Sequence, residues 1–144
     1  MYRILLADDE ELSRMVLERL LKREEETKLA GIAEDGDELL KMIEKEKPDI
    51  VITDICMPGH SGLETIASTL ERGMATRFII TSAYANFEYA RKAIQLGVED
   101  FLPKPVRGEE LHKAIENVKK KLGQKVPQAI SYSRIIKAAK TYID

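Results

Sequence analysis

Two short apolar runs decide the fold of this chain: IVIT at residues 50–53 and FIIT at residues 78–81. Successive residues in both runs are apolar and rich in β-branched side chains, which is typical of strands buried on both faces of a parallel sheet. Three further stretches have strand character, namely YRILLA at 2–7, LAGIA at 29–33 and VEDFL at 98–102. The sequence therefore predicts five strands, two of which are fully buried.

The segment after the first predicted strand has helical period. Its apolar residues recur three and four positions apart, and its charged residues Glu18, Lys22 and Arg23 are expected to face solvent. We expect a buried stripe made of Leu12, Met15, Val16, Leu17, Leu20 and Leu21.

Four more helical segments separate or follow the remaining strands. One over 37–47 has Asp35 and Glu38 as a capping pair, and a weaker one covers 62–70. The fifth helix begins after Gly108 and has a lysine-rich last turn, as the helix dipole favours; its predicted buried stripe is Leu111, Ile115, Val118 and Leu122. The fourth predicted helix ends at Gly97, and the residues that indicate it are Phe87, Tyr89, Ala90, Ala93, Ile94 and Leu96.

Alternation of strands and helices with short connections predicts the fold class. Parallel neighbours in a sheet need right-handed helical crossovers, so five such units give a doubly wound α/β fold with a five-stranded parallel sheet. The chain has 144 residues, which suits one compact domain over residues 1–122 and a short extension.

Composition excludes several function classes. The formal net charge is -2, so no overall basic field favours nucleic acid. The single cysteine, Cys56, rules out a disulfide framework and a multi-cysteine zinc site. No apolar run approaches the roughly 20 residues of a membrane span, and no leader peptide is evident, so we expect a cytoplasmic protein without membrane contact.

Polar side chains follow four of the predicted strands at their carboxyl ends. Asp8 and Asp9 end the first, Asp54 ends the third, Ser82 ends the fourth and Lys104 follows the fifth. In a doubly wound sheet the functional site lies beyond this edge, so we expect these groups to converge.

The other polar residues have simpler interpretations. Glu10 and Glu11 suit negative charges at a helix N-terminus. His60 and His112 are expected to face solvent, and Cys56 to be a small loop residue without catalytic partners.

The converging groups suit phosphoryl transfer. Clustered carboxylates without a thiol or imidazole are hard oxygen ligands of the kind that Mg²⁺ prefers. An aspartate can act as a nucleophile toward phosphorus and form an aspartyl phosphate. A metal ion on one side and Lys104 on the other would neutralise the peripheral oxygens, and the Ser82 hydroxyl would donate a hydrogen bond to one of them.

The sequence resembles the receiver domains of bacterial two-component response regulators, related to CheY, over residues 2–122. The resemblance rests on four motifs in order: ILLADDE, DIVITDICMPGHSGLE, FIITSAY and AIQLGVEDFLPKP. It implies a flavodoxin-like (βα)5 fold with strand order 2-1-3-4-5. It also implies that Asp54 is the phosphoacceptor and that a sensor histidine kinase is the partner.

The same resemblance assigns the supporting residues. Asp8, Asp9, Asp54 and the backbone carbonyl of Cys56 would hold Mg²⁺, and the Lys104–Pro105 bond would be cis. Lys104 would pair with the phosphoryl group.

Switching and signal lifetime are assigned in the same way. Ser82 would be the switch hydroxyl, and Phe101 the aromatic switch, although phenylalanine lacks the hydroxyl that tyrosine would offer there. Cys56 and Tyr84 would tune dephosphorylation. Phosphorylation would shift the surface from the fourth helix through the fifth strand to the fifth helix, favouring partner binding or a homodimer.

The last residues suggest an output. GQKVPQAI at 123–130 reads as a linker, and SYSRIIKAAKTYID at 131–144 as an amphipathic helix. The receiver motifs resemble the YesN-type subgroup, and the terminal helix resembles the start of an AraC-type DNA-binding domain. We therefore expect a receiver that contacts DNA only through a domain lying beyond these residues.

Three alternatives are weighed against this interpretation. A stand-alone receiver would act by binding a protein partner, with the terminal helix packed on the domain. An aspartate-nucleophile phosphatase of the haloacid dehalogenase type requires a second aspartate two residues after the nucleophile. That position is occupied by Cys56, which disfavours this alternative. A flavodoxin is disfavoured because the acidic residues after the first strand would repel the flavin phosphate.

Overall fold

The computed structural model of the chain describes residues 1–59, 62–83 and 92–122. Its strands are β1 (Tyr2–Ala7), β2 (Thr27–Ala33), β3 (Ile50–Asp54), β4 (Arg77–Ser82) and β5 (Asp100–Pro103). Its helices are α1 (Glu11–Leu21), α2 (Gly36–Glu46), α3 (Gly62–Glu71) and α5 (Gly108–Lys121), and residues 92–95 are also helical.

All strand pairs are parallel, and the sheet has the order β2-β1-β3-β4-β5. The predicted doubly wound fold and its strand order are therefore confirmed. β3 is central and every one of its residues is buried, as its continuous apolar run indicates.

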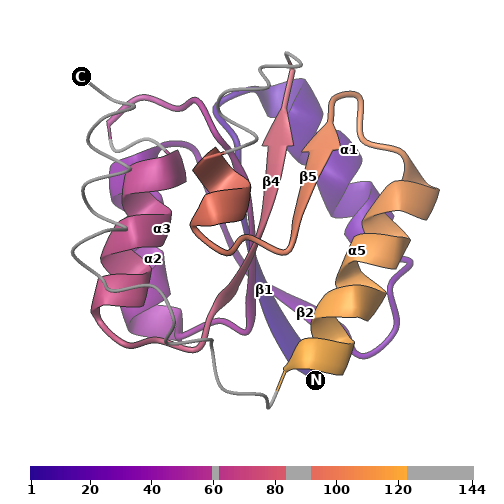
Figure 1. Cartoon of the computed structure of the whole chain (residues 1–144). Helices are drawn as coiled ribbons and strands as arrows, with labels where there is room; N and C mark the ends of the chain where they lie inside the picture. Colours follow the sequence, from indigo (N-terminus) through magenta and orange to yellow (C-terminus); the bar gives the residue numbers. More distant parts are fainter. Residues whose placement is uncertain (60–61, 84–91, 123–144) are drawn as a thin grey trace.

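Helices cover both faces of the sheet (Figure 1): α2 and α3 lie on one side, α1 and α5 on the other. The core accordingly divides into two clusters. Leu5, Val51 and Ile80 point toward the α2 and α3 side, whereas Leu6, Ile52 and Ile79 point toward the α1 and α5 side. This alternation follows from the two-residue period of a strand.

The strand register aligns the carboxyl ends. Ala7 of β1 pairs with Thr53, which precedes Asp54, and Asp54 pairs with Thr81, which precedes Ser82. The residues that follow these strands therefore lie at one edge of the sheet.

Helix α1 departs from its prediction. Leu17 and Leu21 are buried and Leu20 partly so, but Leu12, Met15 and Val16 are 73%, 53% and 40% exposed. The predicted six-residue stripe was wrong because it spans more of the helix circumference than the sheet and α5 cover.

Other local predictions are confirmed in detail. The Asp35 carboxylate caps α2 by accepting a hydrogen bond from the Glu38 N–H at 2.7 Å. The Lys104–Pro105 peptide bond is cis. In α5, Leu111, Ile115 and Val118 are buried as predicted, whereas Leu122 is half-buried.

Strand β5 begins two residues later than predicted. Gly97 ends the preceding helix with φ +90°, and the Val98 N–H still bonds to the Ala93 carbonyl, so Val98 belongs to the helix end. The carboxylate of Glu99 forms ion pairs with Arg77 at 2.6 Å and Lys121 at 2.8 Å, next to the sheet.

Several predictions fall outside the described residues. They are the first part of the fourth helix, Tyr84, His60, and the linker and helix over 123–144. In the described ranges, no helix has the length and apolar character needed to cross a membrane.

Candidate functional site

Four strand ends bring a lysine and several carboxylates together at the carboxyl edge of the sheet. Asp8 is fully buried, and Asp54 and Ser82 are each 5% exposed. Asp9 lies beside Asp8 and is exposed. The predicted convergence of these groups is thus seen in the structure.

Lys104 occupies the centre of this cluster. Its ammonium donates a hydrogen bond to Asp54 Oδ2 at 2.6 Å and lies 2.8 Å from Asp8 Oδ2. Glu10 Oε1 lies at 3.4 Å. The backbone N–H of Lys104 bonds to the Ser82 carbonyl at 2.7 Å, which fixes the loop after β5 to the end of β4.

Backbone contacts hold the Asp54 carboxylate. Its Oδ1 accepts a hydrogen bond from the Cys56 N–H at 3.0 Å, and the Ile55 N–H bonds to the Thr81 carbonyl. A Cβ at Gly62 would lie 2.9 Å from both the Asp54 carbonyl oxygen and Ile55 Cα. Only glycine lets α3 begin this close to the strand that carries Asp54.

Asp8 is held in the same way. Its Oδ1 accepts a hydrogen bond from the Glu10 N–H at 2.9 Å, and its carbonyl accepts one from Arg14 Nη1 at 2.7 Å. Its Oδ2 is buried, and the Lys104 ammonium lies 2.8 Å from it.

Comparison with known proteins agrees with this site. Residues 4–116 match the family described as the response regulator receiver domain. The chain belongs to the receiver domain family. Transcriptional regulatory protein YesN of Bacillus subtilis is 36% identical over 119 residues, which is 82% of this chain and 32% of YesN. Chemotaxis protein CheY of Listeria monocytogenes is 31% identical over 83% of this chain and 100% of CheY.

Solved receiver structures share the fold. The receiver of NarL from Mycobacterium tuberculosis superposes with a TM-score of 0.78 at 29% identity, covering 83% of this chain and 96% of that one. The receiver of AraT from Geobacillus stearothermophilus gives 0.74 at 29% identity, covering 85% and 96%. The chain spans only 32% of YesN and 35% of the methylesterase of Koribacter versatilis that it also matches.

Electrostatics in this receiver follow from burial. Burial raises the pKa of Asp54 above its ordinary value, and the Lys104 ammonium and the Cys56 N–H offset only part of that rise. Burial alone would lower the pKa of Lys104, but its contacts with Asp54 and Asp8 raise it above its ordinary value. Lys104 is therefore a fixed cation at neutral pH.

The surroundings of Cys56 disfavour its thiolate form. Burial raises its pKa, and the negative charges of Asp54 and Asp9 raise it further. Cys56 contributes through its backbone N–H instead.

An oxygen-lined cation site fits the same carboxylates. Asp8, Asp9, Glu10 and Asp54 can each offer one oxygen, and these atoms lie within 4.8 Å of one another. The buried Asp8 Oδ2 contacts the Lys104 ammonium at 2.8 Å, and a carboxylate oxygen has a second lone pair that a hard cation would use. An all-oxygen donor set suits Mg²⁺ and is the kind of acidic pocket in which receivers bind it.

Sequence reasoning missed one member of the cluster. Glu10 was interpreted as a helix N-terminal charge, but its side chain makes no cap hydrogen bond and lies beside Lys104. Its position directly after two aspartates was the available signal. Phe101 is half-buried against the α2 and α3 side of the core, below the site.

Proposed function

We propose that this receiver accepts a phosphoryl group on Asp54 from a sensor histidine kinase and uses it to control a regulatory output. The observation that carries the proposal is the contact of Lys104 with both Asp54 and Asp8 in a buried carboxylate cluster. A buried pair of carboxylates with a fixed lysine is poised to receive a further anion once a divalent cation is bound.

The proposed step is an in-line displacement. A carboxylate oxygen of Asp54 attacks phosphorus, and the bond from phosphorus to the phosphohistidine nitrogen breaks. The electron pair stays on the imidazole nitrogen, which takes up a proton, and the product is an aspartyl phosphate. Lys104, already within 2.6 Å of Asp54, pairs with a phosphoryl oxygen.

Mg²⁺ is the proposed cofactor. Asp8, Asp9, Asp54 and the Cys56 carbonyl would hold it, and its role is to neutralise charge on the carboxylates and on the incoming phosphoryl oxygens. The exposure of Asp9 and the burial of Asp8 leave one side of this set open to solvent.

Ser82 and Phe101 are the proposed switch. Ser82 ends β4, and its carbonyl is bonded to the Lys104 N–H, so a change at Lys104 reaches β4 directly. Phe101 of β5 pairs with Ile80 of β4, which lies two residues before Ser82. A shift of the Ser82 hydroxyl toward phosphate would be accompanied by movement of the Phe101 ring and a change in the surface formed by the fourth helix, β5 and α5.

Helix α1 supplies the proposed kinase contact. Its exposed Leu12, Met15 and Val16 begin three residues after Asp9, so this apolar face lies next to the acidic cluster. Exposed apolar clusters rimmed by charge mark protein interaction sites. A kinase docked there would present its phosphohistidine to the cluster.

Transcription is the proposed output, through an AraC-type DNA-binding domain beyond the receiver and in the cytoplasm. YesN is a transcriptional regulatory protein of which this chain spans 32%. Phosphorylation would favour a homodimer. A stand-alone receiver is the second candidate, because the chain matches 100% of the length of a CheY protein.

The phosphorylation proposal is tested by intact mass after incubation with acetyl phosphate, with and without Mg²⁺. We expect a gain of one phosphoryl group that requires the metal and is absent in Asp54→Asn. A folded wild-type protein that binds Mg²⁺ and gains no phosphoryl group would contradict the proposal.

A further inference from the structure

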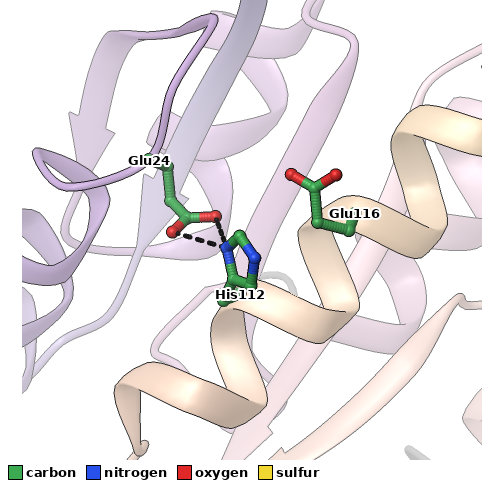
Figure 2. Close-up of side chains that lie close together, drawn as sticks. All are labelled: Glu24, His112 and Glu116. Carbon is green, nitrogen blue, oxygen red and sulfur yellow. Dashed lines mark hydrogen bonds and ion pairs between the residues drawn. The ribbon is translucent and has the colours of Figure 1, made fainter.

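A second group of titratable side chains lies where α5 meets the segment after α1 (Figure 2). His112 and Glu116 are one turn apart on α5, and Glu24 comes from the connection between α1 and β2. Asp8 precedes α1 and Glu24 follows it, so the length of α1 separates this group from the acidic cluster.

The Glu24 carboxylate faces the imidazole of His112 with both oxygens. Nδ1 of His112 lies 3.0 Å from Oε1 and 3.1 Å from Oε2 of Glu24. The two oxygens can share one N–H in a bifurcated hydrogen bond, and the same spacing also suits a cation held by the ring nitrogen and the carboxylate. The three residues can each offer one ligand atom, and these atoms lie within 4.8 Å of one another.

Burial of the Glu24 carboxylate favours a bound cation at this place. The Glu24 side chain is only 8% exposed, and within residues 1–59, 62–83 and 92–122 the His112 ring is the one side chain that bonds to its carboxylate. A mostly buried carboxylate without a positively charged partner lowers the stability of the folded state. The nearby Lys119 does not pair with Glu24, because its ammonium donates hydrogen bonds to the Glu25 carbonyl at 2.7 Å and to the Glu116 carboxylate at 3.1 Å.

Space for a hydrated ion is present. An open pocket of about 360 Å³ lies beside this group, lined by Arg23, Glu25, Glu26, His112, Glu116 and Lys119. Water in this pocket can fill the coordination positions that the protein leaves free.

We propose that Glu24, His112 and Glu116 form a binding site for a divalent transition metal ion of the zinc class. One imidazole nitrogen with two carboxylate oxygens is a ligand set that zinc accepts, and the nitrogen distinguishes it from the all-oxygen set that suits Mg²⁺. Two ligand atoms, each about 2.0–2.2 Å from zinc, lie roughly 3–3.5 Å apart, close to the spacing of Glu24 and His112.

Binding has a structural consequence. The ion would join the α1–β2 connection to α5, the helix that leads into residues 123–144. Because such an ion binds the folded state only, it stabilises the receiver by an amount that rises with the logarithm of its concentration once that concentration exceeds its dissociation constant. Metal binding here does not depend on phosphorylation of Asp54.

The chain has two histidines, so nuclear magnetic resonance of the imidazole ring signals gives a direct test. The folded protein is titrated with zinc chloride in millimolar Mg²⁺, and His60→Gln assigns the two rings. We expect the His112 signals to shift with a one-to-one stoichiometry while those of His60 do not. Cobalt in place of zinc is expected to give visible absorption bands of a nitrogen and oxygen ligand set.

Variants separate this site from the acidic cluster. We expect His112→Gln to raise the zinc dissociation constant at least about tenfold and Glu116→Gln to raise it as well. Glu109→Gln, an exposed glutamate of the same helix, is the matched control and is expected to bind zinc like the wild type. Circular dichroism without zinc checks that each variant is folded.

Two results would overturn the proposal. One is a His112 ring that does not respond to millimolar zinc. The other is zinc binding that His112→Gln keeps and Asp9→Asn loses, which would assign the metal to the acidic cluster.

Discussion

The ammonium of Lys104 lies 2.6 Å from Oδ2 of Asp54, joining two strand ends that are fifty residues apart in the chain. The same ammonium lies 2.8 Å from Asp8. One cation thus holds two buried carboxylates together, and the order of this edge of the sheet depends on it.

Loss of that cation should destabilise the fold. We expect Lys104→Met to lower the free energy of unfolding by about 3 kcal/mol without metal, because two buried carboxylates lose their partner. Mg²⁺ should restore part of this loss. Urea unfolding with and without Mg²⁺ measures both effects. Lys113→Met, at an exposed position of α5, serves as control and should change stability by less than about 0.5 kcal/mol.

Asp54 should affect stability in a pH-dependent way. Because its pKa is raised in the folded protein, the folded state binds a proton that the unfolded state has released, so stability falls as pH rises through this window. We expect metal-free Asp54→Asn to be more stable than the wild type at pH 7. The difference should narrow as the pH falls toward the ordinary carboxyl value of about 4. Urea unfolding at several pH values, in the presence of a chelator, measures the stability difference between the two proteins. A difference that widens toward low pH would contradict a raised pKa for Asp54 in the folded protein.

Gly62 is expected to tolerate no side chain. A Cβ there would meet backbone atoms of Asp54 and Ile55 at 2.9 Å, which cannot move without shifting the site. We expect Gly62→Ala to cost about 1–3 kcal/mol and to slow phosphorylation by acetyl phosphate. The matched change Gly108→Ala, which meets only a Leu20 methyl group at 3.3 Å, should be nearly neutral. Equal losses of stability in both variants would show that the cost comes from replacing glycine at the start of a helix, not from the contact with Asp54 and Ile55.

The exposed face of α1 should matter for the kinase alone. We expect Leu12→Ser with Met15→Ser to reduce the rate of phosphoryl transfer from a cognate kinase at least about tenfold. Phosphorylation by acetyl phosphate should be unchanged, because neither side chain belongs to the acidic cluster. Ile94→Ser, equally apolar and 65% exposed elsewhere, is the control. If kinase transfer survives the double change, the docking surface lies elsewhere.

Features that depend on local sequence pattern could be predicted from the sequence. The apolar runs of β3 and β4 predict central strands, and residues after parallel strands must share an edge, so Asp8, Asp54 and Lys104 were found together. Asp35 and Glu38 were likewise recognisable as a cap.

Features that depend on tertiary packing were not accessible in this way. Leu12 and Met15 have the spacing of core residues, and only the positions of the sheet and α5 show that these two elements leave them exposed. The contact between Glu24 and His112 joins residues 88 apart, and no spacing rule pairs a loop glutamate with a helical histidine.

Residue-level mapping shows whether Asp54 carries the phosphoryl group. After incubation with acetyl phosphate and Mg²⁺, borohydride reduction converts an aspartyl phosphate into homoserine, which peptide mass spectrometry locates. We expect homoserine at position 54 alone, and none when Mg²⁺ is removed. Homoserine at Asp8 or Asp9 with Asp54 unmodified, or no conversion in folded protein that binds Mg²⁺, would contradict phosphorylation at Asp54.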